Sequence, residues 1–303
     1  MKKLYSEGGG RRRILKKVSS CGPLLIISIF WGLAFVAIRR AVFELSPINL
    51  TILRWSLASI VFLIILPFIG KPKTKFERRD LLRLFVIALF AVPFYHLSLN
   101  FAETTVSSGA AGLLISFGPV FIAVLSAYFL KEKIRGRLVL ALFLGILGAM
   151  VLSLPNFGSI SEIAGPFEVV LAAMSFALFS VLSKPLVNKY GAISVTIWSG
   201  IAGTGMLIPF LSSEFVSEAA KLSLTGWFSV LFLSLFSTVV GYLMFYTLVS
   251  RSAVSRLSIQ LYLIPVVSVI GGVLLLQEAL SIYTIAGGAM LLLSIALGTI
   301  KMY

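Results

Sequence analysis

The polar side chains that lie deepest in apolar segments of this sequence are the ones that could carry chemistry. Arg54 stands about two helical turns into one apolar segment. Tyr95 and His96 lie inside another, and Asn100 follows four residues after His96. Residues four apart share a helix face, so His96 and Asn100 are expected to point the same way. These groups could bind an anionic or hydrogen-bonding solute, although Arg54 could instead extend to the lipid headgroups.

Aromatic and polar residues of other apolar segments extend this candidate site. Tyr242 and Tyr246 fall on one helix face. Each aromatic residue has an alternative interpretation as ordinary helix packing, and His96 as a hydrogen-bonded core residue. The candidate substrate-binding residues are Trp31, Tyr95, His96, Asn100, Ser116, Tyr242, Tyr246, Gln260 and Tyr262, with Arg54 as the candidate charge partner.

The residue types do not favour an enzyme or a metal-binding protein. The chain has one cysteine, Cys21, and one histidine, so no cluster of metal ligands is expected and no cofactor is predicted. No Ser/His/Asp arrangement or pair of carboxylates lies within the apolar segments. The acidic residues fall in tails, connections or near segment ends, so a buried carboxylate that relays protons is not expected. Facilitated diffusion and coupling through His96 both remain open.

The composition predicts an all-α integral membrane protein. Hydrophobic residues make up 59% of the 303 residues and charged residues only 12%, with a mean hydropathy of +1.05, whereas soluble domains are about 25% charged. Ten apolar stretches have about the 20 residues that a membrane-spanning helix needs. They are residues 22–42, 47–68, 80–100, 107–130, 136–153, 164–187, 193–212, 224–249, 254–277 and 281–300.

The distribution of cations predicts the orientation of these spans. With a cytoplasmic N-terminus, all 26 lysines and arginines except Arg39, Arg40, Arg54 and Lys221 fall in cytoplasmic segments. Both termini are therefore predicted to be cytoplasmic, with residues 1–21 as a basic tail, in a multi-pass protein of the cell (inner) membrane. The net charge of +15 does not indicate nucleic-acid binding, because no basic face is interleaved with aromatic residues. The expected partners are the bilayer and a small-molecule substrate.

An internal repeat divides the spans into two groups of five. An offset of 146 residues aligns Pro119 with Pro265 and Glu132 with Glu278, and an offset of 145 aligns Trp31 with Phe176. Because five is odd, the second copy must enter the membrane from the opposite side. The repeat predicts two inverted five-helix halves, residues 22–153 and 164–301, an architecture typical of transporters.

The two matched prolines are candidate hinge and cavity residues. Pro119 and Pro265 fall near the middle of their predicted spans, where a proline lacks an N–H and kinks a helix. Such kinks could shape a substrate cavity and allow movement; the alternative is a static kink whose free carbonyl is satisfied by a neighbour.

Together the stretch FWGLAFVAIRR, the segment SSGAAG and the proline-then-glutamate helix of each half resemble the EamA-type drug/metabolite transporters. This resemblance implies ten spans in two halves and export of amino acids, related metabolites or drugs across the prokaryotic inner membrane. We therefore predict a secondary transporter that works by alternating access around a midplane cavity. An intramembrane enzyme, or a channel or non-transporting sensor, is the alternative. The sequence leaves the substrate, the coupling ion and the oligomeric state open, and a monomer is compatible with it.

Overall fold

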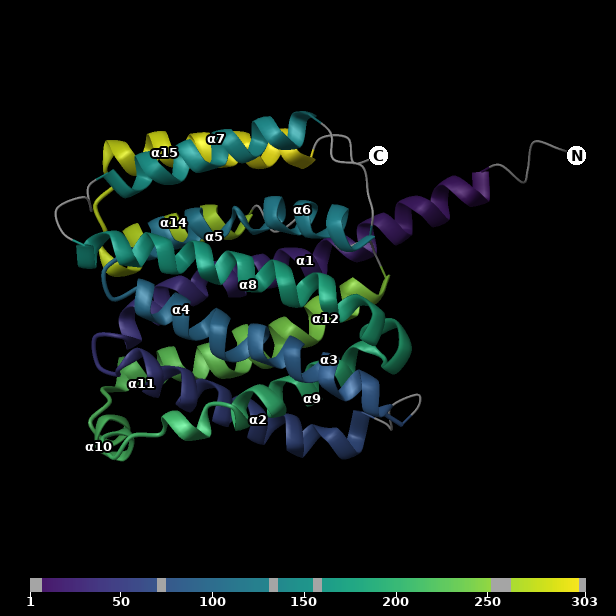
Figure 1. Cartoon of the computed structure of the whole chain (residues 1–303), viewed down its shortest axis with the longest axis horizontal. Coiled ribbons are helices and arrows are strands. Elements are labelled where there is room, and N and C mark those ends of the chain that lie inside the picture. The colour runs from purple at the N-terminus through teal and green to yellow at the C-terminus, as the bar shows by residue number, and fades with distance from the viewer. Residues whose placement is uncertain (1–6, 70–74, 131–135, 155–159, 252–262, 300–303) are drawn as a thin grey trace, which may run out of the picture.

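The computed structural model describes residues 7–69, 75–130, 136–154, 160–251 and 263–299, and every regular element in these ranges is a helix (Figure 1). Helices follow from the composition, because a segment inside a bilayer must satisfy its own backbone hydrogen bonds. The structure thus confirms the all-α class.

The first half of the chain forms helices close to the predicted segments. They are α1 (Glu7–Ala41), α2 (Pro47–Ile69), α3 (Arg78–Leu89), η1 (Phe90–Phe94), α4 (Tyr95–Ala102), α5 (Ser108–Ile115), α6 (Gly118–Leu130) and α7 (Gly136–Ser153). Helix α1 begins at Glu7, so most of the predicted tail of residues 1–21 is helical. The segments α3, η1 and α4 follow one another without a break.

The second half repeats this pattern with more interruptions. Its elements are α8 (Ile160–Tyr190), α9 (Ala192–Gly205), η3 (Ile208–Phe210), α10 (Phe215–Ala220), α11 (Leu224–Leu231), η4 (Phe232–Val240), α12 (Gly241–Arg251), α14 (Leu263–Leu276) and α15 (Ile282–Thr299). In the described part of the chain, six helical segments are long and apolar enough to cross a membrane, and three shorter apolar helices accompany them. The chain is a multi-pass membrane protein.

Pro119 does not kink a continuous helix as expected. It is the second residue of α6, which Ser116 and Phe117 separate from α5. Pro265 lies in α14, but the segment before it, residues 252–262, lies outside the described residues, so a kink at Pro265 stays a prediction. A proline in a first helical turn has no missing hydrogen bond, because the N–H groups there have no partner within the helix. Pro119 therefore follows an interruption between two helices and does not itself kink one.

Helices from the two halves of the chain pack against each other throughout the bundle. Helix α1 and helix α5 both contact α14, α4 contacts α8, and α2 contacts α9 and η4. Along one edge α7 lies beside α15 (Figure 1). This pair is in close backbone contact, since a Cβ added at Gly287 would lie 2.7 Å from the carbonyl oxygen of Gly148.

We name the two ends of the bundle after Glu103 and Asp80, the acidic residues that lie at them. The Glu103 end contains the ends of α1, α4 and α14 and the beginnings of α2, α5 and α11. The Asp80 end contains the beginnings of α3 and α9 and the ends of α2 and α8. Helix α1 begins and helix α15 ends at the Asp80 end (Figure 1).

Candidate functional site

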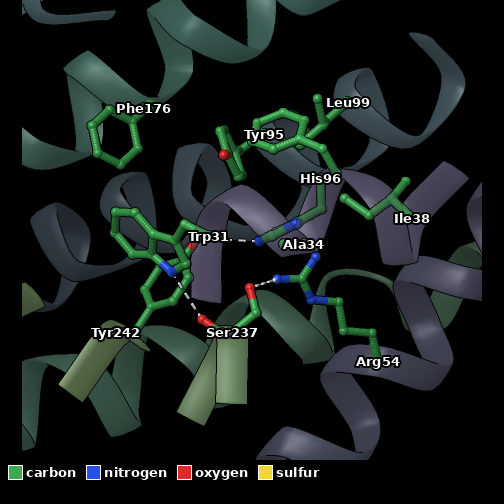
Figure 2. A pocket seen from close by; sticks show the side chains of 11 residues that line it. Trp31, Ala34, Ile38, Arg54, Tyr95, His96, Leu99, Phe176, Ser237 and Tyr242 are labelled. Carbon is green, nitrogen blue, oxygen red and sulfur yellow. Dashed lines mark hydrogen bonds between the residues drawn. The ribbon is translucent and has the colours of Figure 1, made fainter. Parts of the chain in front are cut away.

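A small cavity lies between the two halves, where side chains from α1, α2, α4, α8, η4 and α12 meet (Figure 2). We call it the central cavity. Its volume of about 20 Å³ leaves room for roughly one water molecule. It is lined by Trp31, Ala34, Phe35, Ile38, Arg54, Tyr95, His96, Leu99, Phe176, Ser237 and Tyr242.

Two π-helical segments shape the cavity. In a π-helix the backbone bonds skip one residue further than in an α-helix, and such segments are frequent at functional sites. Segment η1 leads directly into Tyr95 and His96, and η4 carries Ser237. The carbonyl oxygen of Ser237 accepts a hydrogen bond of 3.0 Å from the indole Nε1 of Trp31 (Figure 2). Trp31 is thereby held at the cavity wall, with its ring 5.8 Å from that of Tyr242.

Arg54 is a buried cation without an acidic partner among the described residues. Its side chain is only 2% exposed. Its Nε donates to the hydroxyl of Thr238 at 2.8 Å and its Nη2 to the hydroxyl of Ser237 at 3.1 Å. No carboxylate of the described residues lies within 4 Å of it. An unpaired buried charge costs several kcal/mol, so this side of the cavity favours an anion.

His96 joins the two halves of the chain. Its Nε2 lies 3.1 Å from the hydroxyl of Tyr242, and which of the two donates depends on the tautomer of the ring (Figure 2). The other ring nitrogen, Nδ1, is buried and has no hydrogen-bond partner in the described structure. The cavity thus has two groups that a bound solute could satisfy: a ring nitrogen without a hydrogen-bond partner and a guanidinium without a carboxylate partner, both judged over the described residues.

Residues that the repeat aligns touch each other around the cavity. His96 and Tyr242 are 146 residues apart. Trp31 and Phe176, aligned at an offset of 145, have ring centroids 5.8 Å apart. The hydroxyls of Ser59 and Thr204, which do not line the cavity, are also separated by 145 residues in the sequence and lie 2.8 Å apart.

Comparison with known proteins gives the family. The model of the EamA-like transporter family matches the chain twice, over residues 21–154 and 163–300. The chain belongs to the EamA-like transporter family. A relative from Archaeoglobus fulgidus named "Uncharacterized transporter" is 38% identical, over 90% of this chain and 95% of its own.

Two further relatives of this EamA-like protein carry functional names. A "Probable terminal-alkyne amino-acid exporter" of Streptantibioticus cattleyicolor is 27% identical over 91% of this chain and 92% of its own. A "Probable amino-acid metabolite efflux pump" of Escherichia coli is 26% identical over 85% of this chain and 87% of its own. A protein of known crystal structure shares the fold, with a TM-score of 0.65 at 19% identity, covering 93% of this chain and 97% of that one.

The structure brings some of the predicted site residues of this EamA-like transporter together and separates others. Five of them line the central cavity: Trp31, Arg54, Tyr95, His96 and Tyr242. Gln260 and Tyr262 lie outside the described residues.

The remaining candidates do not line the cavity. Asn100 donates to the hydroxyl of Thr51 at 2.8 Å, and Ser116 donates to the carbonyl oxygen of Leu113 at 2.6 Å. Tyr246 is fully buried and packs beside Tyr242, with ring centroids 6.4 Å apart. In this conformation these three side chains act in helix packing.

Several lining residues, and Thr238, which binds Arg54 without lining the cavity, were not predicted from the sequence. Ser237 and Thr238 are small hydroxyl residues in an apolar segment, where a hydroxyl usually bonds to its own helix backbone. Phe176 could have been found, because the repeat aligns it with Trp31. Ala34, Phe35, Ile38 and Leu99 carry no signal that separates them from other apolar residues.

The acidic residues were expected in tails, connections or near segment ends, and two of those in the described structure, Asp80 and Glu103, are nevertheless buried. Glu103 follows α4 and is 0% exposed, and neither of its carboxylate oxygens has a hydrogen-bond partner in the described structure. It lies in the connection between α4 and α5. The connection is covered by α8, where a Cβ added at Gly165 would lie 2.2 Å from the hydroxyl oxygen of Thr105.

Proposed function

We propose that this chain is a secondary transporter that exports small metabolites bearing a carboxylate, amino acids among them, across the prokaryotic inner membrane. The observation that carries the proposal is Arg54, a buried guanidinium that has hydroxyl partners and no carboxylate partner among the described residues. It lines the same cavity as His96, whose Nδ1 has no hydrogen-bond partner among those residues. A substrate carboxylate would supply the missing negative charge. The names of the Streptantibioticus and Escherichia relatives support this substrate class.

We further propose ten spans in two inverted halves, with both termini in the cytoplasm. Residues related by a twofold axis can touch each other only near that axis. The contacts of Trp31 with Phe176, Ser59 with Thr204, and His96 with Tyr242 support such an axis through the central cavity. With this orientation the Glu103 end faces outward and the Asp80 end faces the cytoplasm.

Transport by this architecture requires the two halves to move. A cavity of about 20 Å³ is too small for an amino acid. Contacts between the halves close both ends. At the Glu103 end, Glu218 accepts from the backbone N–H of Ser46 at 2.8 Å. At the Asp80 end, Lys189 donates to Asp80 at 2.8 Å. Alternating access would break one set of contacts at a time.

Counterflow in proteoliposomes tests the proposal. Labelled amino acids are offered singly, with the matching amino-acid amides, which lack the carboxylate, as competitors. We expect saturable counterflow in which the amides compete poorly. Loss of a charged hydrogen bond costs about 1.5–3 kcal/mol, so Arg54→Gln should raise the half-saturating concentration about 10- to 150-fold. His96→Ala should also raise the half-saturating concentration.

Arg79→Gln is the matched control, because Arg79 is exposed at the beginning of α3, away from the cavity. It should leave counterflow unchanged. Flux that stays linear to high concentration would contradict a carrier. Equal competition by amides and acids would contradict carboxylate recognition.

A further inference from the structure

Glu103 is buried, and its carboxylate has no hydrogen bonds in the described structure that would offset the cost of removing it from water. The residue is 0% exposed and both carboxylate oxygens have no hydrogen-bond partner among the described residues. An ionised carboxylate in that state would cost several kcal/mol, whereas a protonated one costs much less. The closed structure at this end therefore favours a neutral Glu103.

The internal repeat provides a comparison for this position. Arg39 in the first half aligns with Lys184 in the second, and Glu103 aligns with Val249. The side chain of Arg39 donates to the backbone carbonyl of Glu103, and Lys184 donates to the backbone carbonyl of Val249. Both halves thus build the same contact.

The aligned side chains differ, because Val249 is apolar and also 0% exposed. A valine fills this buried position in one half, so the fold does not need a carboxyl group there. Glu103 is an ionisable group in a place that packing alone would give to a hydrocarbon side chain. Packing alone therefore does not explain why a glutamate stands there.

Charged groups from three parts of the chain interact electrostatically with Glu103. They are Arg39 on α1, Arg54 on α2 and Glu278 beyond α14. Burial raises the pKa of Glu103 well above its usual range; Arg39 and Arg54 oppose this rise and Glu278 adds to it. In the described structure Arg39 contacts the backbone of Glu103 and makes no ion pair with its carboxylate.

We propose that Glu103 is a proton-binding site of this transporter, which holds a proton while the Glu103 end is closed and releases it to water when that end opens. In the closed state the proton stays on a carboxyl oxygen. On opening, water hydrates the carboxylate and the proton passes to bulk water as hydronium. This rests on the proposed alternating access.

Proton binding at Glu103 makes opening depend on pH. The pKa is raised in the closed state and returns toward its usual value when the group is hydrated, so the closed state binds more protons. Low pH therefore favours closure, and rising pH favours opening. Between the two pKa values the ratio of open to closed molecules rises by up to about tenfold per pH unit, the slope for one proton.

The first experiment asks whether the proton is bound. Infrared difference spectra of the purified protein in nanodiscs, recorded as the pH is raised, should show loss of a protonated carboxylic-acid band. This band should be absent in Glu103→Gln and in Glu103→Val, which carries the residue of the aligned position. It should persist in Glu214→Gln, the control at an exposed acid on the same end.

The second experiment asks whether the proton controls opening. Spin labels are placed at Thr104 and Leu280, two exposed positions from the two halves, in a Cys21→Ser background. In the wild type we expect a longer distance to gain population as the pH rises. Glu103→Gln should remove this dependence and keep the end closed, while Glu214→Gln should retain it.

The outcomes separate this proposal from the proposed function. A Glu103 carboxylate that is already ionised at neutral pH in the closed state would overturn the proton site. A pH dependence that survives in Glu103→Gln would overturn its role in opening while leaving alternating access intact. A single distance at every pH, together with the infrared band, would overturn opening itself and with it the transport mechanism.

Discussion

Glu278 offers the most direct test of how the Glu103 end closes. It follows α14, where Gln277 has a φ of 57° and the N–H of Glu278 bonds to the carbonyl of Gly272 at 3.0 Å. This turn carries the carboxylate of Glu278 to the beginning of α5 in the other half of the chain. There it accepts from the backbone N–H of Ser108 at 2.8 Å, the Ser108 hydroxyl at 3.0 Å and the N–H of Gly109 at 3.2 Å.

The substitution Glu278→Ala removes a helix cap that one half supplies to the other. Loss of a capping side chain costs about 0.5–2 kcal/mol. If this contact breaks when the end opens, the loss falls on the closed state alone. At about 1.4 kcal/mol per tenfold change, the ratio of open to closed molecules should rise about 2- to 30-fold. Glu278→Gln, which keeps one acceptor oxygen, should have a smaller effect.

The assay is the rate at which a maleimide alkylates a cysteine placed at Leu99, in a Cys21→Ser background. Leu99 lines the central cavity and is 2% exposed, so it reacts only when the cavity opens. The alkylation rate should rise by the same factor as the open population. Glu214→Ala, at an exposed acid of the same end, should leave the rate unchanged. Equal rates in Glu278→Ala and the parent protein would refute the closing role of this cap.

Two further predictions concern stability. Gly287→Ala should lower the free energy of unfolding by about 1–3 kcal/mol, because its Cβ would lie 2.7 Å from backbone atoms of α7. The control is Gly205→Ala, whose Cβ would meet nothing within 4 Å and which should be near neutral. Thermal unfolding in detergent compares the two variants. Asp80→Ala should cost about 1–3 kcal/mol, because this buried carboxylate accepts hydrogen bonds from Lys189 at 2.8 Å and Tyr190 at 2.7 Å. Glu77→Ala should cost less than about 1 kcal/mol in the same assay, because its side chain is 63% exposed.

Much of the architecture could be predicted because the membrane leaves few solutions. Apolar segments of spanning length must be helices, and the repeat was visible in matched prolines and glutamates. The same offset aligned His96 with Tyr242, although the contact between them was not anticipated. Sequence alignment relates equivalent positions without saying which of them lie at the axis. That information required the three-dimensional packing of the halves.

Other features escaped prediction for local physical reasons. Thr238 binds Arg54 through a hydroxyl that sequence alone cannot distinguish from one bonded to its own helix. Pro119 was expected to kink a helix, but it starts a new one, because the chain had already left the helix at Ser116. Glu103 lies near the end of a span, as expected for an acidic residue, but the sequence does not show that α8 packs against its neighbours, where a Cβ at Gly165 would lie 3.3 Å from the carbonyl oxygen of Ala102.

The departures from the repeat bear on how the proposed transporter chooses between its two open states. If the halves were identical, opening at either end would have the same free energy, because the twofold axis would convert one open state into the other. Only residues that break the repeat can make the ends differ. Where Arg39 and Lys184 preserve the repeat, the pair of Glu103 and Val249 breaks it. A buried carboxylate at one end alone makes the opening of that end, and not of the other, depend on proton concentration, so Glu103→Val should bring the pH responses of the two ends together.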